Sequence, residues 1–399
     1  MKEEGCSMID YGKVLSKTAL DLKPSGIRKF FDMIANMDDV VALTVGQPDF
    51  VTPWHIREAG IESLEKGMTY YTSNSGMSEL RSEIAKYLKR RFDLNFDYKD
   101  EVVVTVGGSE AIDLAIRALV EYGRGDEVII PTPSFVCYAP LVTLAGGVPV
   151  IIETKAENDF KLTPEELKRA ITPKTKMLVL PYPNNPTGAI MTKSELEEIA
   201  EVLKNTNIAI LSDEIYAEMS YGQKHTSIAT LPEMAERTIL VSGFSKAYAM
   251  TGWRIGYVCA PREIMAQILK IHQYAIMCAP ITAQIAATEA VKNGDWDIEM
   301  MVAEYDRRRS YIYEGLNTIG LECFEPKGAF YIFPSVSGFG LDCEEFCERL
   351  LYEEKCAIVP GTAFGESGEG YARISYAYSV KHIGEALNRM EAFVKKLKK

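Results

Sequence analysis

The chain has 399 residues, of which 47% are hydrophobic and 25% charged, which is typical of globular proteins. A chain of this length buries about three quarters of its unfolded surface, and we expect more than one domain. The formal net charge of -12 argues against nucleic acid and anionic membranes as partners, because both bind basic surfaces.

No stretch predicts a secretion signal or a membrane helix. The most apolar stretch runs from Ala275 to Val291, and Pro280 and several polar residues interrupt it. The eight cysteines are scattered, which predicts reduced thiols that mostly fill the core. Cys343 and Cys347 lie four residues apart, but no further cysteine pair or histidine nearby in the sequence completes a metal site. We therefore expect a soluble, cytoplasmic protein without a metal.

Two interpretations of the N-terminal stretch "KPSGIRKFF" (residues 23–31) stay open. In the first, the stretch closes over a binding site, where Arg28 meets an acidic substrate side chain, or Ile27 and Phe30 meet an apolar or aromatic one. In the second, Arg28 lies at the surface and the two apolar residues pack in the core. Their periodicity favours the second.

From Glu101 onward, predicted strands and helices alternate. The predicted strands are "EVVVTV" (101–106), "DEVIIPTP" (126–133), "VPVIIE" (148–153), "KMLVLPYP" (176–183), "IAILSDEIY" (208–216), "TILVSG" (238–243) and "RIGYVCA" (254–260). Helices are predicted at residues 107–123, 163–170 and 192–204, the last two opening with the capping boxes Thr163–Glu166 and Thr192–Glu195. This alternation predicts a mostly parallel sheet covered on both faces, with binding sites at the carboxyl ends of its strands.

After Asn293 the alternation stops. A long charged helical pattern, "MVAEYDRRRSYIYEGL" (301–316), precedes short strand-like pieces such as "GAFYIFP" (328–334) and "YARISYAY" (371–378). We therefore expect an α/β protein with a three-layer α/β/α large domain in residues 46–292. A smaller α+β domain is expected in residues 293–399, with residues 1–45 contributing to it.

Four polar stretches follow predicted strands of the sheet. Gly107, Gly108 and Ser109 open a helix, where free N–H groups and the helix dipole favour a phosphate. An ordinary glycine turn explains them equally well, and no G-x-G-x-x-G indicates a dinucleotide. Asn185 in "PYPNNPTG" (181–188) offers an amide, although the stretch alone favours a rigid loop.

The other two stretches carry a carboxylate, a phenol and a lysine. Asp213 and Tyr216 lie in "SDEIY" (212–216), where Asp213 taken alone favours a helix cap. "SGFSKAYAMTGWRIG" (242–256) places Lys246 among small and aromatic residues, with Arg254 eight residues later. A buried lysine loses its proton readily and becomes a nucleophile, although an isolated lysine is more commonly solvated.

One ligand uses all of these groups together, and it is pyridoxal phosphate. Its aldehyde needs a lysine to form a Schiff base. Its ring nitrogen needs an acidic partner to stay protonated, and its ring oxygen needs hydrogen-bond donors. Its phosphate needs N–H groups, hydroxyls and arginine. Each stretch is weak evidence alone, and their joint presence at strand ends favours this cofactor.

Three of these stretches, "PYPNNPTG", "SDEIY" and "SGFSKAYAMTGWRIG", together with "YARISYA" (371–377), resemble in order and spacing the class I aminotransferases of the fold-type I pyridoxal-phosphate enzymes. The stretches "VGQPDF" (45–50), "YYTSNSGMSELR" (70–81), "PKGAFYIFP" (326–334) and "PGTAFG" (360–365) match the same family. The resemblance runs from about Leu43 through "YARISYA", nearly the whole chain.

This resemblance implies a role for each matching residue. Lys246 would form the internal aldimine and shuttle the proton between the substrate Cα and C4′ of the cofactor. Asp213 would pair with the ring nitrogen, Asn185 and Tyr216 would hold the ring 3-oxygen, and Phe135 would stack on the ring. The residues implied to hold the phosphate are Gly108, Ser109, Glu110 through its backbone N–H, Ser245, Arg254 and, from the neighbouring subunit of a homodimer, Tyr71. Arg373 would bind the substrate α-carboxylate, assisted by the Gly46 backbone and Asn185.

The chain departs from the family pattern at Gly243, where many relatives carry a hydroxyl residue. This departure leaves open whether Ser242 or Ser245 supplies a hydroxyl to the phosphate. Tyr138 and Tyr331 have two equally supported interpretations, as residues lining the substrate side or as core tyrosines.

The implied activity is ping-pong transamination between an L-amino acid and a 2-oxo acid. One alternative is a β-elimination lyase or an aminocyclopropane-forming synthase, which use the same lysine, aspartate and arginine. A remoter alternative is a non-catalytic α/β protein that binds a phosphate-containing ligand. That alternative gives no reason for Lys246, Asp213 and Arg373 to occur together.

Overall fold

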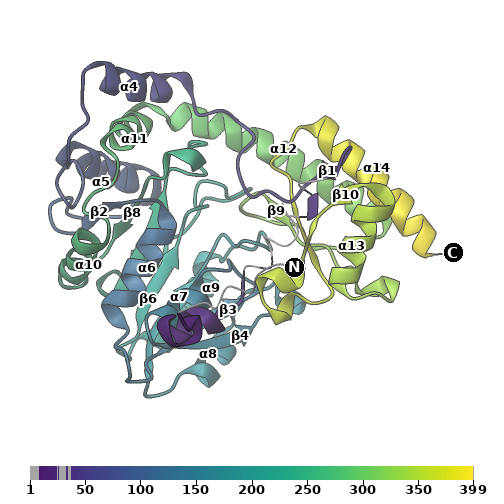
Figure 1. Ribbon diagram of the computed structural model, residues 1–399, viewed down its shortest axis with the longest axis horizontal. Helices are drawn as coiled ribbons and strands as arrows, with labels where there is room; N and C mark the ends of the chain where they lie inside the picture. Colours follow the sequence, from purple (N-terminus) through teal and green to yellow (C-terminus); the bar gives the residue numbers. More distant parts are fainter. Residues whose placement is uncertain (1–8, 25, 27–32, 35–36, 399) are drawn as a thin grey trace.

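A seven-stranded sheet forms the centre of the computed structural model, which describes residues 9–24, 26, 33–34 and 37–398 (Figure 1). Its strands, in order across the sheet, are β2 (Val102–Thr105), β8 (Gly256–Cys259), β7 (Thr238–Gly243), β6 (Ala209–Asp213), β5 (Thr175–Leu180), β3 (Glu127–Thr132) and β4 (Val148–Glu153). Strand β8 runs antiparallel to both of its neighbours, and all other neighbouring pairs are parallel. The predicted mostly parallel sheet is confirmed.

Helices cover both faces of this sheet. One face carries α6 (Gly108–Leu119), α7 (Tyr138–Leu144) and α10 (Arg262–Ala275). The other face carries α8 (Pro164–Ala170) and α9 (Lys193–Leu203) at one end, and α4 (Trp54–Glu65), α5 (Ser78–Phe92) and α11 (Ile281–Asn293) at the other. Neighbouring residues of a strand point to opposite faces, so Val103 packs under α6 whereas Val102 and Val104 pack under α5 and α11. The three-layer arrangement follows from strands that are apolar on both faces.

Both predicted capping boxes are present. The Thr163 side chain accepts the N–H of Glu166 while the Glu166 side chain accepts the N–H of Thr163, and Thr192 and Glu195 form the same pair at α9. Each pair satisfies two helix N–H groups that otherwise lack a partner. Local sequence therefore determines where these two helices begin.

The C-terminal part of the chain is built from three helices and short strands. The helices are α12 (Asp295–Ile319), α13 (Cys343–Glu354) and α14 (Val380–Leu397). Strands β9 (Tyr331–Ile332), β12 (Ala372–Ser375) and β11 (Val359–Pro360) form an antiparallel sheet, and β1 (Val41–Ala42) pairs in parallel with β10 (Cys356–Ala357). The segment around β1 therefore joins the C-terminal part.

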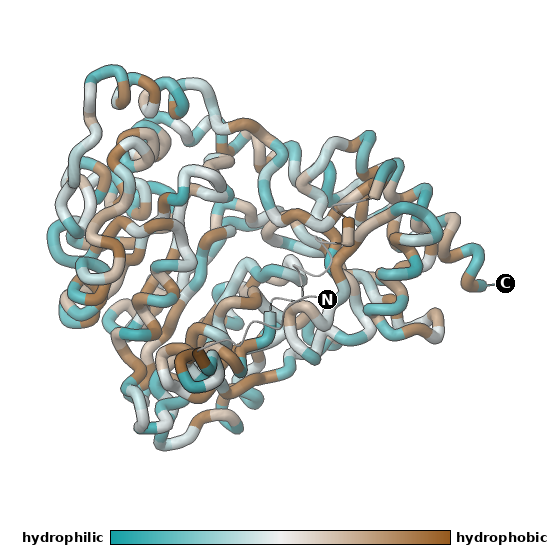
Figure 2. The backbone as a smooth tube through the Cα atoms, in the orientation of Figure 1, coloured by the Kyte–Doolittle hydropathy of each residue, from teal (hydrophilic) through white to brown (hydrophobic). Residues whose placement is uncertain are grey.

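A separate buried cluster stabilises this part of the molecule. It joins Leu43 from the N-terminal side to Tyr305, Phe330, Phe346 and Phe393. Figure 2 shows hydrophobic stretches along the central strands and in the C-terminal part, with hydrophilic stretches along the outer helices.

The domain boundaries at residues 45 and 292 stay predictions. Two short helices, α1 (Tyr11–Val14) and α2 (Lys17–Asp21), lie before β1 in the chain. Ile27, Arg28 and Phe30, for which the sequence left two alternatives, fall outside the described residues.

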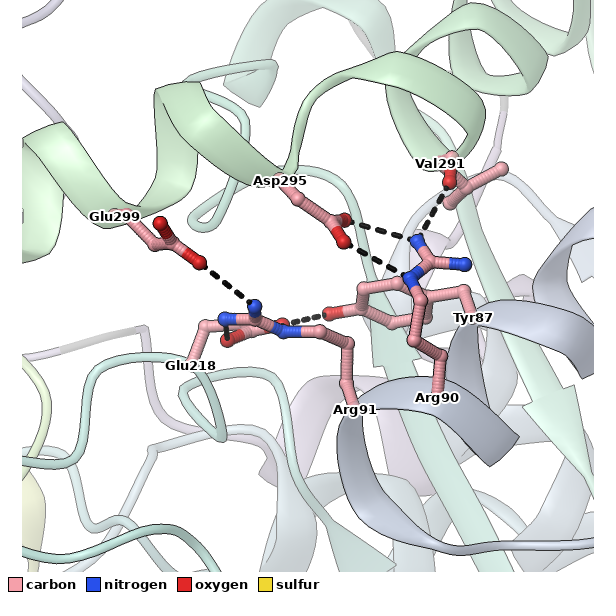
Figure 3. Close-up of polar contacts among 7 residues, drawn as sticks. All are labelled: Tyr87, Arg90, Arg91, Glu218, Val291, Asp295 and Glu299. Atoms are coloured by element: carbon pink, nitrogen blue, oxygen red, sulfur yellow. Dashed lines mark hydrogen bonds and ion pairs between the residues drawn. The ribbon is translucent and has the colours of Figure 1, made fainter.

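A polar network ties the start of α12 to α5 (Figure 3). Arg90 on α5 donates two hydrogen bonds to the Asp295 carboxylate, both of 2.9 Å. Arg91 donates to Glu299 on α12 and to the partly buried Glu218. In Figure 1, α12 runs from the large sheet's helices toward α14, so this network fixes the end of the helix that connects the two parts.

The described residues contain no helix that is long and apolar enough to cross a membrane. Within the same residues, no group of three or more histidine, cysteine, aspartate or glutamate side chains is arranged to hold a metal ion. Cys343 and Cys347 are both buried on α13, and the Cys343 thiol donates to Glu369.

Gly243 ends β7 opposite Gly256 of β8, and a Cβ atom at Gly243 would lie only 2.9 Å from the Gly256 Cα. We expect Gly243→Ala to lower the free energy of unfolding by about 1–3 kcal/mol, because two backbones would have to separate. Urea unfolding measures this change. Gly338→Ala is the control, since a Cβ there meets no atom within 4 Å. Equal losses in the two variants would contradict the close backbone contact.

Candidate active site

A cavity of about 400 Å³ lies between the carboxyl edge of the large sheet and the small C-terminal sheet. Most of the predicted site residues line it: Gly46, Gly108, Ser109, Phe135, Asn185, Asp213, Tyr216, Ser245, Lys246, Arg254 and Arg373. They come together because the parallel strands end at one edge, while β12 brings Arg373 from the opposite side. Glu110 and Tyr71 are not among its lining residues.

Lys246 follows β7 and points into this cavity rather than into solvent. Its Nζ donates a 2.6 Å hydrogen bond to the Gly46 carbonyl. Burial, followed by the positive charges of Arg373 and Arg254, lowers the pKa of Lys246 to about 8, while the negative charge of Asp213 opposes this shift. A substantial fraction of this amine is therefore neutral near physiological pH, as a nucleophile or a general base requires.

Asp213 is the last residue of β6 and is buried, with 7% of its surface exposed. Its Oδ2 accepts a 2.7 Å hydrogen bond from the Tyr138 hydroxyl, and its Oδ1 accepts one from the Ile215 N–H. Burial raises the pKa of Asp213, and the two hydrogen bonds and Lys246 oppose this rise. A cation placed beside this carboxylate would be strongly favoured.

Arg373 lies opposite, on β12, and 3% of its surface is exposed. It donates 3.1 Å and 2.5 Å hydrogen bonds to Asn185 Oδ1 and the Thr44 carbonyl. Its guanidinium lies 4.7 Å from the centroids of both the Tyr331 and the Phe364 rings. Its Nε–H has no hydrogen-bond partner in the described structure, which leaves a buried donor for an anionic ligand.

Two tyrosines lie between Arg373 and Lys246. The hydroxyls of Tyr216 and Tyr331 are 2.8 Å apart, and both side chains line the cavity. The structure thus places Tyr331, for which the sequence left two interpretations, on the cavity side. Gly46 is required beneath it, because a Cβ at that position would lie 2.2 Å from the Tyr331 hydroxyl oxygen.

The opposite end of the cavity gathers hydrogen-bond donors at the start of α6. Gly107 precedes the helix with a φ of 80°, and a Cβ there would lie 2.5 Å from an Arg254 nitrogen. Ser109 lies in the first turn of this helix, and Ser245 and Arg254 line the same cavity. The helix N–H groups, two hydroxyls and a guanidinium together suit a phosphate.

The two serines that the sequence left open lie in different places. Ser245 lines the cavity, whereas the Ser242 hydroxyl donates to the Glu214 carbonyl and the residue is not among the lining residues. The Glu110 carboxylate also points away from the cavity, toward His272, with a 2.7 Å contact to its Nδ1. This agrees with an interpretation of Glu110 that needs only its backbone N–H.

Tyr71 is 79% exposed and lies away from the cavity. Tyr138, for which the sequence left the substrate side and the core as alternatives, both lines the cavity and packs in a buried cluster. Its hydrogen bond to Asp213 was not predicted. Its position three residues after Phe135, at the start of a helix beside the site, is the signal that could have identified it.

A family model, aminotransferase class I and II, matches residues 38–390. The chain belongs to this family. It is 54% identical to the putative aminotransferase YugH of Bacillus subtilis, with 96% of this chain and 98% of that protein covered. It is 47% identical to an aspartate aminotransferase of Pyrococcus abyssi, with 95% and 98% covered. A Pyrococcus crystal structure, described as protein-A1, superposes with a TM-score of 0.93 at 46% identity, covering 96% of this chain and 98% of the other.

Membership of the family makes the chain a transferase of amino groups, and the class I aminotransferases use pyridoxal phosphate. The resemblance inferred from the motifs is confirmed. Neither the lyase nor the non-catalytic alternative is favoured, because the matches cover nearly the full length of named aminotransferases.

Lys246 should react with amine-directed reagents at unusually low pH. The neutral form of Lys246 increases as the pH rises through about 8. At that pH, a lysine with the ordinary pKa of 10.5 has a neutral fraction about two orders of magnitude smaller. Labelling the cofactor-free protein at a series of pH values, with mass spectrometry of the Lys246 peptide, measures this. The Lys246→Ala variant lacks the reactive amine, so the label that disappears in this variant belongs to Lys246. A labelling midpoint near 10.5 would contradict the effect of burial and the two arginines.

Proposed function

We propose that this aminotransferase binds pyridoxal phosphate in the described cavity and moves the amino group of an L-amino acid to a 2-oxo acid through Lys246 in a ping-pong reaction. The observation that carries the proposal is the convergence of a weakly basic amine, a buried carboxylate and a buried guanidinium around one cavity. The lining residues include three basic side chains and one carboxylate, and this balance suits an anionic ligand that also carries a cationic ring.

The cavity fits the three functional parts of the cofactor. The Lys246 amine suits the aldehyde, and the buried Asp213 carboxylate suits a protonated ring nitrogen. Ser109, Ser245 and Arg254 at the start of α6 suit the phosphate, together with the N–H groups of Gly108 and Glu110.

The remaining lining residues suit the ring and the substrate. Phe135 would stack on the ring, and Asn185 and Tyr216 would donate to its 3-oxygen. The unpartnered Nε–H of Arg373 would donate to the substrate α-carboxylate, with Asn185 and the Gly46 backbone beside it. Arg373 suits a planar carboxylate, because its donors match the two oxygens in one plane.

Pyridoxal phosphate, when bound, withdraws electrons from the substrate and so weakens the bond between Cα and its hydrogen. Lys246 takes that proton from the substrate Cα, and its lowered pKa lets the amine both accept and release a proton near neutral pH. Arg373 fixes the carboxylate so that the Cα hydrogen faces Lys246. Asp213 supplies the negative charge that keeps a ring nitrogen protonated.

The side chain of the substrate amino acid is a separate question. Among the described lining residues the cations are Lys246, Arg254 and Arg373, and each already has a role with the cofactor or the α-carboxylate. A substrate with a second carboxylate, as the aspartate aminotransferase relative suggests, therefore needs a cation from another part of the chain or from a partner. Arg28 is the residue that the sequence offers for this role.

We also propose a homodimer in which Tyr71 reaches the phosphate of the neighbouring subunit. Tyr70 and Tyr71 are 61% and 79% exposed, and the same loop donates a hydrogen bond from Asn74 to the carbonyl of the exposed Met277. Tyr274 nearby, at the end of α10, is 88% exposed. Exposed aromatic residues gathered on one surface favour a protein interface.

A cytoplasmic location is part of the same proposal. All seven cysteines in the described residues are free, and three of them, Cys343, Cys347 and Cys356, are buried around α13. Free, buried thiols are typical of proteins from reducing compartments.

Lys246→Ala should abolish transamination, with a loss of about 10⁴-fold or more, because both the attachment of the cofactor and the proton transfer need the amine. The measurement mixes cofactor-loaded protein with single amino acids, aspartate and glutamate first, and follows loss of the yellow absorption band and formation of the 2-oxo acid. Lys193→Ala, at an exposed lysine, is the control. Wild-type protein that binds no pyridoxal phosphate would overturn the proposal, and ammonia release in place of transfer would indicate a lyase.

Mixing inactive chains tests the shared site. If Tyr71 serves the neighbouring subunit, a hybrid of a Lys246→Ala chain with a Tyr71→Ala chain contains one intact site and one doubly defective site. Co-purified hybrids carrying two different tags should then recover about half of the wild-type activity per dimer, because hybrid dimers close by two-fold symmetry. No recovery above the separate variants would contradict a phosphate contact across the interface.

A further inference from the structure

The buried hydroxyl of Tyr138 is committed to the carboxylate that the cofactor needs. It donates to Asp213 Oδ2 at 2.7 Å, and Tyr138 is 2% exposed. We propose that Tyr138 is a positioning residue for Asp213, which holds the carboxylate ionised and in a fixed orientation toward the cofactor's ring nitrogen. This inference rests on the proposed function, because it assigns Asp213 to the cofactor.

The position of the hydroxyl is set by packing on several sides. Tyr138 is the first residue of α7, and its ring belongs to the buried cluster with Ile112 and Val142. Phe135 packs edge-on against it, with ring centroids 6.2 Å apart and an interplanar angle of 83°. A tyrosine side chain has only two torsions before its ring, so a ring held by packing also fixes the position of its hydroxyl oxygen.

The two oxygens of Asp213 are held by donors from different elements. Oδ2 is held by Tyr138 at the start of α7, and Oδ1 by the N–H of Ile215 after β6. A carboxylate with a donor on each oxygen cannot rotate freely, yet each oxygen keeps capacity for a further hydrogen bond. One such position remains for a ring N–H in the cavity that both Asp213 and Tyr138 line.

A neutral donor suits this position better than a cation would. Burial disfavours the charged form of Asp213, and a hydrogen bond to the carboxylate opposes that effect. A lysine or arginine in contact with the carboxylate would also favour its ionised form. Such a cation would, however, cancel much of the negative charge that stabilises a protonated ring nitrogen. In the described residues Asp213 has no ion pair within 4.0 Å, so its charge stays available.

The test is Tyr138→Phe, which removes the hydroxyl and keeps the ring and its packing. We expect the dissociation constant for pyridoxal phosphate, measured by equilibrium dialysis, to rise about tenfold. We also expect the pH midpoint of the yellow absorption band to move upward, because a less ionised Asp213 leaves the ring less electron-withdrawing. The value of kcat should fall by a similar factor, with a smaller change in KM.

Tyr87→Phe is the matched control. Tyr87 is also a buried tyrosine, 4% exposed, and its hydroxyl donates to the Glu218 carboxylate at 2.6 Å, away from the cavity (Figure 3). Removing this hydroxyl affects stability as Tyr138→Phe does, and it should leave the dissociation constant and the band's pH midpoint unchanged. Equal effects of the two variants on the cofactor would overturn the inference, because they would indicate a general loss of stability.

Asp213→Asn supplies the second comparison. If Tyr138 acts through Asp213, adding Tyr138→Phe to Asp213→Asn should change cofactor affinity by less than about twofold. A full tenfold additional effect would overturn the inference, as would a Tyr138→Phe protein that binds and titrates like the wild type. Failure of the wild-type protein to bind pyridoxal phosphate would instead overturn the proposed function.

Discussion

The electrostatic coupling of Lys246 to its buried neighbours is the interaction on which the rest of the site depends. The amine lies in a cavity that also holds the guanidinium of Arg373 and, at the far end, that of Arg254. Burial and these two charges lower its pKa to about 8, and Asp213 limits the effect. Because each charge is held in place by its own hydrogen bonds, the basicity of the amine is a property of the folded chain and is absent from the sequence around Lys246.

This coupling requires the large sheet and the small C-terminal sheet to meet at one cavity. Asp213 and Lys246 follow neighbouring parallel strands, β6 and β7, and so share one edge of the large sheet. Arg373 comes from β12 of the small sheet, and its hydrogen bond to Thr44 depends on the segment after β1. The N-terminal segment therefore contributes to the site together with the C-terminal part of the fold. More than 300 residues of sequence separate Thr44 from Arg373.

The strands, the capping boxes and most site residues could be predicted because they depend on local sequence. Thr163 and Thr192 cap their helices through residues three positions away, and Lys246 and Asp213 lie at strand ends that apolar runs mark clearly. The direction of β8 could not be predicted, since an apolar run is the same in a parallel and an antiparallel strand. The hydrogen bond between Tyr138 and Asp213 was harder to predict, because the two residues lie 75 positions apart and only the place of Tyr138 at a helix start beside the site points to it.

The departure at Gly243 has a steric explanation in three glycine backbones that lie close together near the start of α6. A Cβ at Gly243 would lie 2.9 Å from the Gly256 Cα, and one at Gly256 would lie 2.7 Å from the Gly107 carbonyl carbon. The backbones of β7, β8 and the turn before α6 are therefore in direct contact. This contact leaves no space for a hydroxyl side chain at Gly243, and Ser245, two residues later, carries a hydroxyl to the cavity instead. Close backbone packing thus explains the glycine at position 243, and the cavity still has a serine hydroxyl, that of Ser245, in its lining.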